Sequence, residues 1–148
     1  MNRRRNPMVK ICPSCYAVCV DQKWCFDEKA RQRIMKGNGW EKHLCPGCEK
    51  VARGKVDGVV YLRGDFLRAH REEAKNLIRS VAERKLRKNI AARIAHIEEK
   101  DDEIVIQTTD RALAERLGKE FERAFSGRLD IQWQHGADFA RVYWTRDG

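Results

Sequence analysis

The sequence predicts an α+β fold in two parts, and three observations indicate it. Near the N-terminus, four cysteines form two Cys-Pro-x-Cys motifs, a spacing typical of metal sites. From about residue 65, apolar residues recur at helical spacing among many basic ones. The remainder alternates apolar and polar residues around one further helix. We therefore expect an N-terminal zinc ribbon, joined by a long basic amphipathic helix to a four-stranded sheet with helices on one face.

The apolar residues are unevenly distributed along the 148 residues. Leu, Ile, Val and Phe number 9 in residues 1–58 and 23 in residues 59–148. The first part can hardly bury a core by itself, so metal binding must contribute to its folding free energy. The expected segments are a basic arm at residues 1–10, a zinc ribbon at 11–58, a strand and basic helix at 59–89, and a ββαββ α+β domain at 90–148.

The two cysteine motifs predict the metal site. Two thiolates three residues apart on a tight turn converge on one point, and two such turns complete the tetrahedron of sulfurs, at about 2.3 Å, that zinc prefers. A catalytic zinc usually keeps an open position, whereas four sulfurs close the shell, so we expect one structural Zn²⁺. The expected ligands are Cys12, Cys15, Cys45 and Cys48.

Two further cysteines lie between the motifs and leave alternatives open. Cys19 or Cys25 could replace one of the four ligands or remain a free thiol, and His43 could also be a ligand. As free thiols they fit small buried apolar side chains better than a redox pair. A thiol-based sensor is the remaining alternative, because Lys23 and Lys29 could lower the thiol pKa values.

The expected elements of the first part are short. Val9 and Ile11 lead as a strand into the first motif. Trp24 and Phe26 alternate with lysines and arginines, a pattern that suits stacking on unpaired bases. The same aromatics could cover the zinc site of a very small fold, and we favour that packing interpretation for both.

The second part begins with a short strand at 59–62. Asp65 can cap the start of the long helix that follows. Thr109 and Asp110 form a second cap, before a helix that ends ahead of Gly127. The remaining expected strands are 90–98, 104–108, 129–133 and 140–144.

Charge divides the chain into a basic front and an acidic back. Residues 1–58 carry a net charge of +7, residues 59–100 carry +5, and residues 101–148 carry −3, within a total of +9. Some lysines beside the motifs could simply offset the −2 charge of a four-thiolate zinc, but the surplus is larger and indicates a face that meets a polyanion. The candidate nucleic-acid-binding residues are Arg3, Arg4, Arg5, Lys50, Arg53, Lys55, Arg68, Arg71 and Lys75.

Several function classes lack their sequence signals. The chain has no phosphate-binding loop, no dinucleotide fingerprint and no nucleophile with a recognisable histidine partner, so we expect no enzyme activity. No secretory signal and no membrane-length apolar run occur, and cysteines in metal-like spacing indicate a reducing compartment. We expect a cytoplasmic protein.

The order of these features resembles a known family. The paired motifs, the basic Arg53 to Lys55 region before a glycine-bounded strand, and the hairpin and helix at 104–121 resemble the N-terminal part of the large-subunit (60S) nuclear export adaptor family. The resemblance is closest to short bacterial proteins of unknown function related to that family and covers about residues 11–144. It implies binding to the ribosomal large subunit and no catalytic residues. The longer relatives have two zinc clusters, whereas this chain has cysteines for one.

Two function classes are therefore expected. The first is a zinc-ribbon protein that binds structured RNA, most plausibly on the ribosomal large subunit, through the zinc part and the basic helix. The second is a protein-protein adaptor or regulator with a purely structural zinc, whose partner binds the sheet or the acidic C-terminal half.

Overall fold

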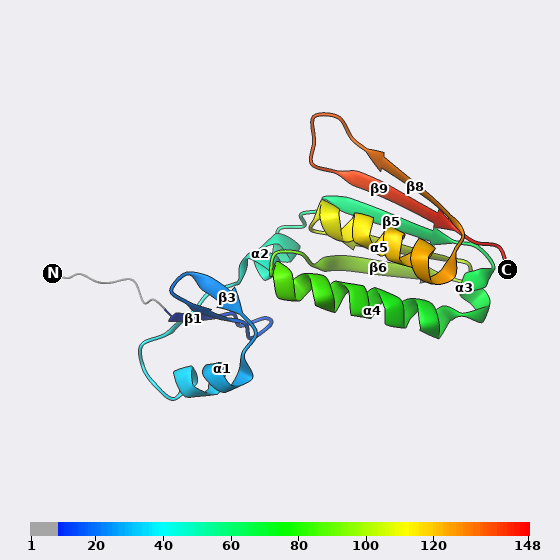
Figure 1. The fold of residues 1–148 in the computed structure, drawn as a ribbon. Helices are drawn as coiled ribbons and strands as arrows, with labels where there is room; N and C mark the ends of the chain where they lie inside the picture. The colour runs from blue at the N-terminus through cyan, green and yellow to red at the C-terminus, as the bar shows by residue number, and fades with distance from the viewer. Residues whose placement is uncertain (1–8) are drawn as a thin grey trace.

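The computed structural model describes residues 9–148, and its strands form two separate sheets with five helices around them (Figure 1). The α+β class is confirmed. The smaller sheet belongs to the part that holds the cysteine motifs, and the larger sheet belongs to the rest of the chain. The predicted basic arm, with Arg3, Arg4 and Arg5, lies outside the described residues apart from Val9 and Lys10.

The N-terminal half, residues 9–52, is built from short elements around a very small core. Its elements are β1 (Val9–Ile11), β2 (Val18–Val20), β3 (Lys23–Cys25), α1 (Glu28–Met35), β4 (Glu41–Lys42) and α2 (Pro46–Ala52). The strand order is β3-β2-β1-β4, and β4 runs parallel to β1. One small cluster buries Ile11, Val18 and Ala30, against which Ile34 and Trp40 pack, and a second buries Ala17 among the motif cysteines. Such a core is too small to stabilise the half by packing alone.

The C-terminal half, residues 58–148, contains a five-stranded sheet, so the predicted four-stranded sheet is wrong. Its elements are β5 (Gly58–Arg63), α3 (Phe66–Ala69), α4 (Arg71–Lys88), β6 (Ile94–Lys100), β7 (Glu103–Thr108), α5 (Arg111–Phe125), β8 (Arg128–Trp133) and β9 (Ala140–Thr145). The order β6-β7-β5-β9-β8 places β5 in the centre, antiparallel to β7 and parallel to β9. The sequence placed β5 in a segment that connects the two parts, but β5 is the central strand of the sheet. Its neighbours β7 and β9 come from much later in the chain.

The long basic helix also differs from the prediction. The helical run is interrupted at His70, whose φ of −126° and ψ of 36° are not helical, and Asp65 makes no side-chain capping bond. α4 is not a bare connection, since its Ala74, Ile78 and Val81 are buried in the core of the C-terminal half. The strand predicted at 90–98 begins only at Ile94, and a tight turn precedes it.

Helices α4 and α5 lie on the same face of the large sheet (Figure 1). Asp110 caps α5 as predicted, accepting a hydrogen bond from the Leu113 amide at 3.0 Å. Phe121 of α5 packs edge-on against the fully buried Trp144 of β9, whose indole N–H donates to the Ser126 carbonyl at 2.6 Å. This aromatic cluster and the branched residues of β5 and β7 form the main core.

Side chains alternate along each strand, so every second residue of the large sheet lies on the face opposite α4 and α5. There, Tyr61 of β5 and Tyr143 of β9 are register partners whose rings stack at 4.9 Å, with the Arg63 guanidinium beside both. None of the helices in residues 9–148 is long and apolar enough to cross a membrane.

Candidate metal centre and nucleic-acid interface

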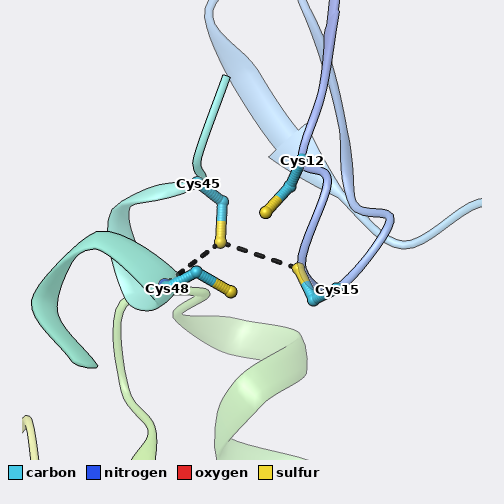
Figure 2. A group of neighbouring side chains, drawn as sticks. All are labelled: Cys12, Cys15, Cys45 and Cys48. Carbon is cyan, nitrogen blue, oxygen red and sulfur yellow. Dashed lines mark hydrogen bonds between the residues drawn. The ribbon is translucent and has the colours of Figure 1, made fainter. Parts of the chain in front are cut away.

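The four motif cysteines converge on one point, as predicted. Their sulfur atoms all lie within 4.8 Å of one another, and the Cys15 and Cys45 sulfurs are 3.7 Å apart. Sulfurs held about 2.3 Å from one central ion are about 3.8 Å apart in a tetrahedron, so the cluster fits a tetrathiolate site for one metal ion. Figure 2 shows the four side chains pointing toward this common centre.

The first pair of ligands is placed by a turn between β1 and β2. The Cys12 amide donates to the Ala17 carbonyl at 2.9 Å, and the Tyr16 amide donates to the Cys12 carbonyl at 3.0 Å. Tyr16 has a φ of 66°, an uncommon value for a residue with a side chain, which reverses the chain directly after Cys15. The turn buries Cys12 fully and leaves Cys15 half-buried.

The second pair is placed by the start of α2. Cys45 is the N-cap residue, and its sulfur accepts a hydrogen bond from the Cys48 amide at 3.4 Å. Pro46 occupies the first helical turn, where its missing N–H is not needed. The Cys-Pro-x-Cys spacing therefore caps a helix and aims two sulfurs at the same point.

Burial and hydrogen bonding give the thiols different pKa values. Burial by itself would raise the pKa of Cys12, but hydrogen bonds from nearby backbone amides favour its thiolate and lower that pKa to about 6. Burial raises the pKa of Cys45 to about 12 and also raises the pKa of Cys48. A metal ion binds thiolates, so metal binding at this cluster must release protons.

One further side chain reaches the cluster, and it comes from the C-terminal half. Arg93 lies in the turn between α4 and β6, and one of its terminal nitrogens is 3.2 Å from the Cys45 sulfur and 3.6 Å from the Cys15 sulfur. The other terminal nitrogen is 3.6 Å from the Cys48 sulfur. A guanidinium so placed would offset part of the −2 charge that four thiolates and a divalent ion carry, and would orient the ligands from outside the coordination shell.

Arg93 is held firmly in this position. Its Nε donates to the Ile90 carbonyl at 2.9 Å, and its backbone amide donates to the Thr109 hydroxyl oxygen at 2.9 Å. The same hydroxyl donates to the Ala91 carbonyl at 2.7 Å, and Thr109 is fully buried. The turn that carries Arg93 is therefore fixed to the end of β7. Burial of the guanidinium by itself would lower the pKa of Arg93, but the nearby cysteine sulfurs raise that pKa.

The two halves also approach each other closely at Gly47 of the second motif. A Cβ added there would overlap the Ile90 carbonyl oxygen and would lie 2.6 Å from the Arg93 Nε. Ile90 in turn packs against the cysteine cluster. Only glycine allows α2 to lie this close to the turn before β6.

The remaining metal-ligand candidates do not join the cluster. Cys19 is buried on β2, whereas Cys25 is exposed on β3, which corrects the expectation that both are buried. Because Cys19 pairs with Trp24 and Cys25 pairs with Val18, the two thiols point to opposite faces of the hairpin and do not form a redox pair. His43 is exposed and lies outside the cluster that the described residues form.

The predicted nucleic-acid-binding residues do not gather in one place. Lys50 and Arg53 lie at the end of α2, and Arg68 is exposed on α3. Lys55 pairs with Asp57 at 3.4 Å. At the start of α4, Arg71 donates to backbone carbonyls of the β6–β7 turn, and both Arg71 and Lys75 pair with Glu99, at 3.6 and 3.4 Å. Arg71 and Lys75 therefore already have partners within the C-terminal half.

A denser group of cations lies at the other end of α4. The last turns of α4 and the first turns of α5 line two hollows of about 410 and 210 Å³ that share Lys85 and Arg116. Arg84 and Arg116 both pair with Glu120, at 3.7 and 3.6 Å. No ion pair neutralises the other four within residues 9–148. We name this surface the basic trough; its cations are Arg84, Lys85, Arg87, Lys88, Arg116 and Lys119.

The basic trough continues into a hollow between the two halves. This hollow has a volume of about 310 Å³, and its lining includes Arg87 and Lys88 from α4 and Trp24 and Phe26 from the N-terminal half. Trp24 packs against the cysteine cluster, as the packing interpretation predicts. Phe26 does not, because 46% of it is exposed and its ring faces the Arg93 guanidinium at 5.8 Å.

Arg93, Arg116 and Lys119 were not expected at a site. No sequence spacing marks Arg93, which falls in a predicted strand, and the two α5 residues meet α4 only through helix packing. The four α4 cations are recognisable in sequence, but cations at a helix C-terminus are ordinary. Comparison with known protein families, with curated proteins and with solved structures finds no match for this chain.

Proposed function

We propose that this protein is a cytoplasmic, non-enzymatic RNA-binding protein with one structural zinc ion. The observation that supports it most is the basic trough, in which six cations from two helices line adjoining hollows. Four of these have no ion-pair partner in the described part of the chain, and unneutralised cations lining a concave surface attract a polyanion such as a phosphate backbone. The resemblance to the large-subunit export adaptor family makes the ribosomal large subunit the first RNA-containing particle to test.

Zinc is the metal that we propose for the cysteine cluster. Four thiolates in a near-tetrahedral arrangement suit Zn²⁺ because it accepts soft sulfur ligands and this geometry. The residues that would hold it are Cys12, Cys15, Cys45 and Cys48, and the ion would stabilise a half whose own apolar core is minimal. Elemental analysis of protein expressed in zinc-containing medium should find one zinc per chain.

The salt dependence of RNA binding tests the proposal at the level of residues. We would measure the affinity for a fluorescein-labelled RNA hairpin at several salt concentrations and compare the slopes of log affinity against log salt. The double variant Arg87→Gln/Lys88→Gln should reduce the slope by about 2, since each phosphate contact contributes roughly 1. A matched variant, Arg71→Gln/Lys75→Gln, should leave the slope unchanged because both cations are already paired with Glu99. Equal slopes for the first variant and the wild type would exclude the trough as the contact surface.

Sedimentation of tagged protein in cell lysate tests the ribosomal target. Co-migration with large subunits that weakens as salt is raised supports it. Protein that binds the RNA hairpin but stays at the top of the gradient at both salts would reject the ribosome and keep RNA binding.

A second function, a protein-protein adaptor, is favoured by one observation. The face of the large sheet that α4 and α5 do not cover (Figure 1) presents the stacked rings of Tyr61 and Tyr143. Aromatic residues of this kind are enriched at protein interfaces. A stoichiometric partner that is lost in Tyr61→Ala, together with RNA binding that does not depend on the trough, would support this function instead.

A further inference from the structure

We propose that the RNA site is a composite of both halves of the molecule, and that the metal ion assembles it, so that metal and RNA each tighten the binding of the other. This inference rests on the proposed RNA-binding function and concerns the regulation of that site. It starts from the hollow at the end of the basic trough, whose walls belong to different halves. Trp24 lies on β3 of the N-terminal half and Phe26 directly follows that strand, while Leu86, Arg87 and Lys88 belong to α4.

Such a hollow exists only while the two halves keep their relative position. An exposed aromatic ring beside two cations offers a nucleic acid both a stacking surface and phosphate contacts. Phe26 supplies that ring, and the cations come from the other half. Anything that displaces the N-terminal half would remove the aromatic wall and leave the cations in place.

The contact that fixes this position is made at the metal ligands. The Arg93 guanidinium reaches the sulfurs of Cys15, Cys45 and Cys48, and Gly47 leaves no room between α2 and the turn before β6. Ile90, which lines the hollow, packs against the same cysteines. The same residues therefore form the contact between the two halves and the surroundings of the cysteine cluster.

The charge at this joint depends on the metal. Four thiolates around a divalent ion carry a net −2, and a guanidinium that contacts three of them is attracted to that charge. Metal binding therefore strengthens the attachment of the N-terminal half to the C-terminal half, in addition to folding the N-terminal half itself.

By linkage, the effect must work in both directions. If the metal increases RNA affinity by a given factor, RNA increases metal affinity by the same factor, and such couplings are typically about 5- to 150-fold. The experiment measures both sides with the full chain. One measurement is the dissociation constant of the fluorescein-labelled RNA hairpin with metal-loaded and with metal-stripped protein, and the other is the zinc affinity with and without saturating hairpin RNA.

Three variants distinguish the docking of the two halves from the folding of the N-terminal half alone. Arg93→Gln and Gly47→Ala keep all four sulfur ligands but disturb the joint, so their zinc-loaded forms should bind RNA more weakly than zinc-loaded wild type. Phe26→Ala should weaken RNA binding by the zinc-loaded protein and leave the metal-stripped protein unchanged, because the aromatic wall is in place only when the halves are docked. Arg141→Gln, an exposed arginine on β9 that stacks on Phe139, is the matched control and should behave as wild type.

The outcomes distinguish this inference from the function on which it rests. Equal RNA affinities with and without metal, or a zinc-loaded Arg93→Gln variant that binds RNA as tightly as wild type, would overturn the inference and leave RNA binding intact. Metal-loaded wild type that binds no RNA at low salt would overturn the proposed function itself. If metal raises the RNA affinity and RNA raises the zinc affinity in the wild type, and both effects disappear in Arg93→Gln, the composite site is established.

Discussion

The Arg93 guanidinium of the C-terminal half lies 3.2 Å from the Cys45 sulfur of the N-terminal half. The residues are 48 positions apart in sequence, yet this contact joins a metal centre to the scaffold on which α4 and the large sheet are built. It means that the cysteine cluster is more than the folding nucleus of a small independent unit. Its properties should depend on a residue that contributes no metal ligand.

We therefore expect Arg93→Gln to lower the metal affinity of the cysteine site by roughly 10- to 100-fold, as changes to outer-shell partners of metal ligands generally do. The neutral amide keeps hydrogen-bonding capacity but offsets none of the negative charge of the thiolates. Competition against a chelator of known zinc affinity measures the change, and Arg141→Gln serves as control. An affinity within twofold of the wild type would show that Arg93 does not act on the metal.

The six cysteines should separate cleanly into ligands and non-ligands. Cys45→Ser should abolish stoichiometric metal binding, because a buried hydroxyl replaces one of four converging thiolates. Cys25→Ser should retain one metal per chain, since that thiol is exposed on β3 and outside the cluster. Metal content by mass spectrometry under non-denaturing conditions decides this. Loss of metal in Cys25→Ser would contradict the assigned ligand set.

Removal of the metal should affect the two halves unequally. The N-terminal half buries one small cluster of Ile11, Val18 and Ala30 and a second one around the motif cysteines themselves, whereas the C-terminal core includes large residues such as Trp144 and Phe121. Chelation should therefore unfold residues 9–52 and leave the large sheet folded. Hydrogen exchange should show amides of β1 and β2 losing protection while those of β5 and β7 keep it. Retained protection in β1 after complete metal removal would mean that packing alone holds this half.

Gly118→Ala should destabilise the C-terminal half by about 1–3 kcal/mol, a usual cost of overpacking. A Cβ at this buried position of α5 would overlap the Val142 side chain and lie 2.8 Å from a methyl group of Leu129. The gain in helix propensity, at most about 1 kcal/mol, should not offset this clash. Urea denaturation followed by Trp fluorescence measures the change. Gly39→Ala, where nothing lies within 4 Å, is the matched control, and an equal effect there would refute the packing argument.

Local sequence patterns predicted the features that local physics controls. The ligand set followed from two Cys-Pro-x-Cys motifs, because three-residue spacing on a tight turn is sufficient to bring two sulfurs together. The α5 helix and its Asp110 cap, and strands β7, β8 and β9, followed from periodicity and capping chemistry. Each of these depends on neighbours within a few residues.

Features that depend on distant pairing were mispredicted or missed. β5 was placed in a connecting segment, because nothing in Val59 to Leu62 shows that β7 and β9 will pair with both of its edges. The single helix expected from Asp65 is broken at His70, where the backbone leaves the helical conformation and Phe66 stacks on the imidazole. Arg71 and Lys75 looked like free cations, but strand β6 brings Glu99 to them.

The sequence by itself determined that this chain has an α+β fold, a cluster of four cysteines that could hold a metal ion, and a surplus of positive charge in its first 100 residues. Only the tertiary structure decided where that charge is concentrated and what borders the metal site. The packing of α4 against α5 creates the basic trough. The turn before β6 places Arg93 against the cysteine sulfurs. The reason is that ligand spacing and charge are properties of a chain segment, whereas a surface shared by distant segments exists only after they have packed together.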